Sequence, residues 1–247
     1  MKETFDHIIS LGYNCQTAFA IQAMYYGKVK PPSNFFNWVF CPTVADIIHF
    51  LSNPKDLFCE GLELNPSAFM YKDLAYNFSY HTTADHKNFY KNGVLNTAFI
   101  KTDKRHVMAR LSYLRDKFFE ALKSKDKNLF VLCYRKNKDQ KEVIENVKTL
   151  SKIIKDTSGC HDSKILIVFE KKHIKRLNLP KLDNVIYRVV KKHAREDCAY
   201  KIDFFGWYFK VLKGIEIRNA PKKSWLNIYR FKKIYGLTFF SKIIKRS

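Results

Sequence analysis

Four short apolar runs constrain the fold of this chain more than any other feature. They are His7–Leu11, Leu129–Tyr134, Ile165–Phe169 and Val185–Val190, and each is rich in β-branched or aliphatic residues. Polar segments bound every run, which is the pattern of parallel strands that are covered on both faces. Arg188 interrupts the last run, which makes it the weakest of the four strand predictions.

Helical patterns separate these runs. Lys104–Lys123 and Asp139–Asp156 carry apolar residues at spacings of three and four, which predicts two amphipathic helices that pack on a sheet. Cys15–Tyr26 is expected to form a first helix directly after the first strand. Strands that alternate with helices predict an α/β fold with a mostly parallel sheet and flanking helices.

The segment from Gly27 to Phe99 follows this rhythm less well. It holds five of the seven prolines and has aromatic residues throughout, so we expect a long irregular insertion of short helices and loops. No Gly/Ser linker divides the chain. We therefore predict a single α/β catalytic domain over residues 1–216, followed by basic, aromatic-rich C-terminal helices over residues 217–247.

Charge and cysteine usage narrow the range of partners and sites. Lys and Arg number 45 against 23 Asp and Glu, a formal net charge of +22, while 46% of the residues are hydrophobic and can form a core. Such an excess of cations suits nucleic acid, an anionic membrane surface or phosphorylated donors. The six cysteines form no C-x-x-C pair, so we expect free thiols and no zinc site. With no signal peptide and no spanning segment apparent, the predicted location is cytoplasmic.

The segment after the first run carries the clearest chemical signal. The strand ends at Leu11, Gly12 permits a tight turn, and Cys15 stands where a helix begins. A thiol at a helix N-terminus faces unpaired amides and the positive end of the helix dipole, which lower its pKa. This arrangement is a nucleophile elbow, and the adjacent amides, with Asn14 and Gln16, are expected to hold an oxyanion. The alternative is a buried structural cysteine.

Two sequence blocks resemble a known family. "SLGYNC" (Ser10–Cys15), followed by "SNFFNWVF" (Ser33–Phe40), resembles the bacterial and viral family named papain-like cysteine peptidases, whose function is unknown. Three later blocks are also similar: "YNFSYHTTADH", "KRHVMARLSYLRDKF" and "NLFVLCYRK". They align His81, Arg110 and Arg135 with the family's pattern. Asn37 stands where the family more often has Asp, which places any role of that carboxylate in question.

The first block is also similar to capsule-biosynthesis proteins that resemble thiol acetyltransferases. What these resemblances imply is a cysteine-dependent acyl-transfer enzyme, a transferase rather than a peptidase, in bacterial surface polysaccharide (capsule or lipopolysaccharide) biosynthesis. The implied acceptor is a saccharide or a lipid-linked saccharide. No cofactor is required, and coenzyme A thioesters or nucleotide sugars are the candidate donors. The four parallel strands suit a flavodoxin-like or SGNH-hydrolase-like layer fold better than papain itself.

Roles for further residues follow from the resemblance and from the local sequence. His81 is the predicted base, with His86 as its nearest competitor, and Asp85 is the predicted orienting carboxylate. Asp103, Asp139 and Asp203 remain alternatives for that third role. The predicted substrate-binding residues are Asn37, Trp38, Arg110 and Arg135, although an exposed arginine can be an ordinary surface cation and a tryptophan an ordinary core residue.

The basic tail has its own signature. No acidic residue follows Glu216, and the last segment forms a basic amphipathic helix if it is helical. We therefore predict peripheral association with the cytoplasmic face of the inner membrane. The predicted contacts are Trp225, Phe239, Phe240, Lys242, Lys245 and Arg246. The alternative is a helix docked on the protein; nucleic acid ranks last because no recognised nucleic-acid motif is present.

Two other functions compete with acyl transfer. One is a glycosyltransferase that acts on a lipid-linked polysaccharide acceptor with a nucleotide-sugar donor; its chemistry needs cations for the donor phosphates but no cysteine nucleophile. The other is a non-enzymatic membrane- or nucleic-acid-binding module in which Cys15 is structural.

Overall fold

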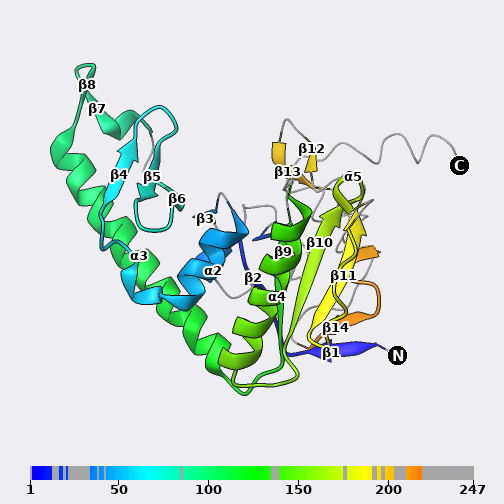
Figure 1. The fold of residues 1–247 in the computed structure, drawn as a ribbon. Coiled ribbons are helices and arrows are strands. Elements are labelled where there is room, and N and C mark those ends of the chain that lie inside the picture. Colours follow the sequence, from blue (N-terminus) through cyan, green and yellow to red (C-terminus); the bar gives the residue numbers. More distant parts are fainter. Residues whose placement is uncertain are drawn as a thin grey trace, which may run out of the picture.

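A four-stranded parallel sheet forms the centre of the computed structural model (Figure 1). The structure describes residues 2–12, 17–18, 21, 34–37, 39–41, 43–83, 86–134, 139–174, 177–190, 194–195, 198–202 and 210–218. The sheet order is β11-β10-β9-β2, with all neighbours parallel. Its strands are β2 (His7–Ser10), β9 (Asn128–Tyr134), β10 (Lys164–Glu170) and β11 (Val185–Val190). All four strand predictions and the α/β class are confirmed.

Arg188 is compatible with its strand because β11 lies at the edge of the sheet. The inner strands β9 and β10 are buried along almost their whole length, whereas the middle of β11 is partly exposed. An edge strand has only one neighbour, so a long polar side chain can reach solvent there without breaking the ladder.

Two long helices connect these strands, as predicted. α3 (Thr97–Lys123) begins seven residues earlier than the sequence pattern indicated, because Asn96 caps it by accepting a hydrogen bond from the Phe99 amide at 3.2 Å. α4 (Gln140–Thr157) is capped by Asp139, and the short α5 (Lys171–Ile174) follows β10. Asp139 therefore has a structural role as a helix cap. The predicted first helix lies mostly outside the described residues, although Thr17, Ala18 and Ile21 are helical.

Alternate residues of the central strands enter two separate cores. Leu132 and Ile167 belong to the core formed with α3, α4 and α2 (Val44–Ser52). Val131 and Val168 face the other way, into a core that includes side chains from residues 210–218. The members of this second core contributed by that segment are Val211, Leu212, Ile215 and Ile217.

The segment 210–218 is also held by a strand pair. β1 (Glu3–Phe5) pairs in parallel with β14 (Ile215–Ile217) at one end of the molecule. The predicted boundary between residues 216 and 217 falls inside β14. A further antiparallel pair, β12 (Ala194–Arg195) and β13 (Cys198–Ile202), precedes this segment. The predicted tail helices lie outside the described residues.

The prediction of an irregular insertion is wrong for much of residues 39–95. Four short strands form an antiparallel sheet in the order β3-β6-β5-β4, and a two-stranded hairpin, β7 with β8, follows. These elements are β3 (Val39–Phe40), β4 (Leu62–Asn65), β5 (Met70–Asp73), β6 (Ser79–His81), β7 (Tyr90–Lys91) and β8 (Val94–Leu95). Short 3-10 turns lie at η1 (Phe35–Asn37), η2 (Pro54–Asp56) and η3 (His86–Phe89). Pro54 is the first residue of η2 and Pro66 lies in the turn between β4 and β5, so neither interrupts a ladder.

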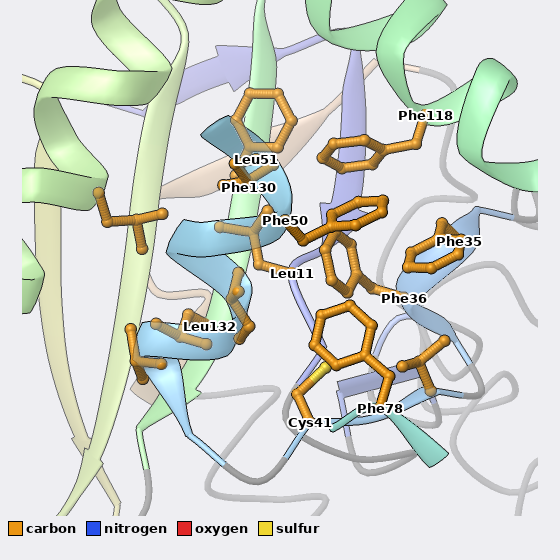
Figure 2. Close-up of a cluster of buried hydrophobic side chains, with 14 of the residues drawn as sticks. Leu11, Phe35, Phe36, Cys41, Phe50, Leu51, Phe78, Phe118, Phe130 and Leu132 are labelled. Atoms are coloured by element: carbon orange, nitrogen blue, oxygen red, sulfur yellow. The ribbon is translucent and has the colours of Figure 1, made fainter. Parts of the chain in front are cut away.

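Aromatic rings fill the space between the antiparallel sheet and the central sheet. Phe35 stacks on Phe50 with ring centroids 4.5 Å apart, and Phe36 meets Phe118 of α3 edge to face at 5.1 Å. Figure 2 shows these rings together with Phe78 and with Leu11 and Leu132 of the central sheet. Through these rings η1 packs on α2 and α3, and Phe36 lies close to Gly12, just after β2.

Candidate active site

The carboxyl end of β2 leads into the predicted nucleophile segment through a constrained turn. Gly12 has a φ of +84°, and a β-carbon there would lie 2.9 Å from Cδ1 of Phe36 and 3.2 Å from Sγ of Cys41. Its amide donates to the hydroxyl of the fully buried Ser10 at 3.0 Å. Glycine is therefore the one residue type that this turn accommodates without strain or a clash.

The residues on both sides of the predicted nucleophile are held together. Thr17 is buried, and its hydroxyl donates to the carbonyl oxygen of Gly12 at 3.3 Å and contacts Sγ of Cys133 at 3.1 Å. Cys15 itself, with Asn14 and Gln16, lies outside the described residues. The described anchors, Gly12 and Thr17, thus place both ends of this segment at the carboxyl edge of the sheet, where α/β proteins bind ligands.

A cavity of about 300 Å³ brings two of the predicted site residues together. His81 ends β6 and is exposed, and Arg110 projects from the middle of α3 and is also exposed. The residues that line the cavity are Phe35, Tyr80, His81, Thr82, Thr83, Val107, Arg110, Leu111 and Leu114. α3 thus contributes three apolar side chains and the Arg110 guanidinium to the wall, and β6 with the residues after it contributes the His81 imidazole and hydroxyl groups.

Asp103 anchors one wall of this cavity. It is buried on α3, and one of its carboxylate oxygens accepts hydrogen bonds from the amide of Thr83, at 3.2 Å, and from the Thr83 hydroxyl. Thr83 is two residues beyond His81, so this contact ties the His81 segment to α3. Burial, together with the neighbouring Asp103, raises the pKa of Tyr71, whose hydroxyl donates to the carbonyl oxygen of Ile100.

Tyr80 is the most deeply buried polar side chain of the wall. Its hydroxyl has no hydrogen-bond partner among the described residues. Burial raises the pKa of Tyr80 well above its ordinary value, and the nearby Asp73, Cys41 and Tyr76 groups raise it further. Tyr80 is therefore a neutral donor that contributes no negative charge to the cavity.

The other predicted residues divide into two groups. Asn37 is described: it is buried in η1, next to Phe35, and is not among the side chains that line the cavity. Of His86, the competing candidate for the base, only the backbone is described. Outside the described residues lie Trp38, Asp85, Arg135 and Asp203, and the tail residues Trp225, Phe239, Phe240, Lys242, Lys245 and Arg246.

The cysteines bear on the prediction of reduced thiols. None of the four cysteines whose side chains are described, Cys41, Cys59, Cys133 and Cys160, forms a disulfide. Within the described ranges, no group of three His, Cys, Asp or Glu side chains could hold a metal ion. No helix in the same ranges is both long and apolar enough to span a bilayer.

A family model described as "Putative papain-like cysteine peptidase (DUF1796)" matches residues 6–173. The chain belongs to this family. In this papain-like family member the matched range includes Cys15, His81 and Arg110, and it stops before β11 and the segment 210–218. No curated protein and no solved structure matched the chain.

Sequence reasoning missed one residue of the candidate site, Thr83, and left the role of another, Asp103, open. Thr83 lies within the block "YNFSYHTTADH" but carried no signal of its own there. Asp103 was only one of several candidate carboxylates, yet its position was informative: it falls on the apolar stripe of α3, four residues before Val107. A carboxylate in such a stripe must meet a donor when it is buried, and here the donor is Thr83.

Proposed function

We propose that this protein is a cysteine-dependent acyl-transfer enzyme. Cys15 is the nucleophile, His81 the general base, and Arg110 binds an anionic part of the substrate. The observation that carries the proposal is the shared cavity of His81 and Arg110, two residues that separate sequence motifs had singled out. Membership in a family described as cysteine peptidases supports a thiol nucleophile.

The contacts around η1 support access from Cys15 to this cavity. Phe35 lines the cavity, and the next residue, Phe36, lies where it would contact a β-carbon on Gly12. Cys15 follows Gly12 by three residues in the sequence. A nucleophile and its base must come within hydrogen-bond reach in the reacting complex, and the closeness of Gly12 to η1 supports the pairing of Cys15 with His81.

The proposed reaction has two half-steps. The Cys15 thiolate attacks the carbonyl carbon of a thioester donor, the donor's C–S bond breaks, and the departing thiol takes a proton from protonated His81. His81 then accepts the proton of an acceptor hydroxyl or amine, which attacks the acyl-Cys15 carbonyl and releases the thiolate. Backbone amides beside Asn14 and Gln16 stabilise the oxyanion in both half-steps, as such donors do in other acyl transfers.

The proposed acceptor is a saccharide of a surface polysaccharide. Its support is the similarity of the "SLGYNC" block to capsule-biosynthesis proteins, and Arg110 is compatible with a phosphate on either the donor or a lipid-linked acceptor. The acyl donor is a coenzyme A thioester, and the protein needs no resident cofactor for this chemistry.

Mass spectrometry after incubation with acetyl-coenzyme A tests the proposal. We expect an acetyl group on the peptide that contains Cys15 and none on Cys59, an exposed free thiol that serves as the matched control. Cys15→Ser abolishes acyl transfer and Cys59→Ser leaves it unchanged. His81→Gln slows acylation by about 10²- to 10⁴-fold, the usual contribution of a general base.

Two outcomes contradict the proposal. One is equal acetylation of Cys15 and Cys59, which indicates ordinary surface thiols. The other is turnover of nucleotide sugars that survives Cys15→Ser, which supports the glycosyltransferase alternative instead.

A further inference from the structure

An apolar hairpin projects from the molecule at the N-terminal end of α3. Figure 1 shows β7 and β8 at the upper left, beyond the start of α3 and away from the central sheet. Three of its side chains are exposed: Val94 to 69%, Tyr90 to 42% and Leu95 to 37%. Of the six large hydrophobic side chains that the described residues expose, these three stand on one hairpin of six residues. Single exposed hydrophobic residues are common, but a cluster at a protruding tip marks an interaction site.

The hairpin has a defined turn and a packed base. Asn92 and Gly93 both have positive φ, at 54° and 78°, which defines the two-residue type I′ turn that best suits a twisted hairpin. At its base the buried Phe89 accepts a hydrogen bond from the Asn96 amide at 2.8 Å and packs edge to face on Phe99 at 5.2 Å. The base of the hairpin is therefore packed and hydrogen-bonded, and the exposed tip residues stand on a regular turn and not in an irregular loop.

The surroundings of the tip are cationic. The sequence contains no acidic residue from His86 to Thr102, and Lys87, Lys91 and Lys101 are all exposed. The first acid that follows, Asp103, is buried and hydrogen-bonded to Thr83. The hairpin thus combines apolar tip residues with exposed lysines nearby, on a chain whose net charge is +22.

This combination fits the chemistry of one partner best. An anionic lipid surface attracts lysines to its phosphates and accepts aliphatic and aromatic side chains at the headgroup boundary. A nucleic acid would use the lysines but leave Val94 and Leu95 in water. A second protein molecule needs roughly 800 Å² from each partner, which is more than a six-residue hairpin offers.

We propose that the β7–β8 hairpin docks this protein on an anionic lipid membrane. Val94, Leu95 and Tyr90 enter the headgroup region, and Lys87, Lys91 and Lys101 contact lipid phosphates. This surface is separate from the cavity that His81 and Arg110 line, so it does not depend on the proposed acyl transfer. It also involves other residues than those of the tail for which membrane contact was predicted from sequence.

Cosedimentation of the full-length protein with vesicles tests this proposal. The vesicles are phosphatidylcholine alone and phosphatidylcholine mixed with phosphatidylglycerol. The test variant is Val94→Glu, and the matched control is Val189→Glu, which places the same charge change on an exposed valine of β11. Circular dichroism of both variants verifies that they are folded.

We expect Val94→Glu to weaken binding to the anionic vesicles at least about tenfold, because it removes the most exposed apolar side chain and adds repulsion. Val189→Glu should weaken it by about twofold at most. Lys91→Gln should weaken it by about fivefold on anionic vesicles only, since each lysine near a charged leaflet contributes about that factor.

Three outcomes overturn the proposal. Equal weakening by Val94→Glu and Val189→Glu means that net charge alone drives binding. Unchanged binding by Val94→Glu means that another surface, such as the tail, makes the contact. A change from dimer to monomer on Val94→Glu, measured by light scattering without a change in vesicle binding, means that the hairpin contacts a second copy.

Discussion

At Gly12 the chain passes from the central sheet to the segment that carries Cys15, and two independent constraints apply to this residue. The left-handed backbone disfavours any side chain, and Phe36 and Cys41 occupy the space that a β-carbon would need. The same glycine that permits the turn thus also permits the close approach of η1. η1 also carries Phe35, which lines the cavity, so one element contacts both the turn and the cavity.

Gly12→Ala should therefore destabilise the protein by about 2–4 kcal/mol, from backbone strain plus overpacking. Gly214→Ala is the matched control, because Gly214 has a similar φ of +76° but a β-carbon there would meet no atom within 4 Å. It should cost about 1 kcal/mol from strain alone. Urea unfolding of both variants measures the difference, and equal losses would mean that Phe36 moves aside freely.

The hydrogen bonds between Asp103 and Thr83 are a second residue-scale feature that shapes the candidate site. Asp103→Ala leaves the amide and the hydroxyl of Thr83 without their acceptor and should cost about 1–3 kcal/mol. Thr83→Val should cost about 1 kcal/mol, the usual contribution of one hydrogen bond. In the double variant the two losses should not add, because both remove the same contact. Additive losses in urea unfolding would show that Asp103 acts through other groups.

At the scale of elements, the length and burial of a segment decide how well the sequence predicts it. The residues of β9 and β10 are buried on both faces, and α3 and α4 carry long apolar stripes, so their patterns were unambiguous. The strands of the insertion have only two to four residues, too few for a period of two to stand out. Phe78 and Tyr80 do alternate with Ser79 and His81, which was the available signal for β6.

The candidate site could be predicted only in part, because it depends on how segments distant in sequence pack together. Family blocks identified His81 and Arg110, but their shared cavity depends on β6 packing beside α3, and the insertion's antiparallel sheet was not foreseen. Thr83 and the role of Asp103 depend on that same packing. Contacts between segments distant in sequence are set by tertiary structure, and local patterns carry little information about them.

The strand β1 offers a test of electrostatics at the element scale. Burial raises the pKa of Glu3, but hydrogen bonds from Lys164 and Lys127 outweigh it and hold the pKa below its ordinary value of 4.5. Because the pKa of Glu3 is lower in the folded than in the unfolded protein, the contacts of Glu3 with the two lysines stabilise the fold at pH values above the unfolded pKa. This stabilisation is lost as the pH falls through the folded pKa.

Glu3→Gln should therefore lower the free energy of unfolding at pH 7 by less than about 1 kcal/mol. The value is small because Glu3 and its two lysines are partly exposed and therefore screened by solvent. The difference from the unsubstituted protein should shrink as pH falls below about 4.5. Urea unfolding at a series of pH values measures it. A difference that persists unchanged at about pH 3, below the ordinary carboxyl range, would assign the effect to packing.

At the scale of the whole molecule, the central sheet depends on both of its covers. One face packs on α2, α3 and α4, and the other packs on side chains from residues 210–218. The latter segment is remote from the family-matched range of residues 6–173, yet it completes the second core and pairs with β1. The two ends of the described chain are thereby joined, and the sheet is buried on both faces as parallel sheets generally are.

A pair of truncations separates this cover from the basic tail. A chain that ends at Lys223 keeps Val211, Leu212, Ile215 and Ile217 and should unfold cooperatively, as the full chain does. A chain that ends at residue 209 loses all four, each worth about 1.5–3 kcal/mol of burial, against a total stability of roughly 5–15 kcal/mol for a typical domain. It should therefore aggregate or unfold without a cooperative transition, because Leu129, Val131 and Leu166 become exposed.

Thermal unfolding followed by circular dichroism compares the two chains. Cooperative unfolding of the shorter chain at the same temperature as the full chain would show that another segment covers this face. Loss of the cooperative transition in the longer chain would place residues 224–247 in the core.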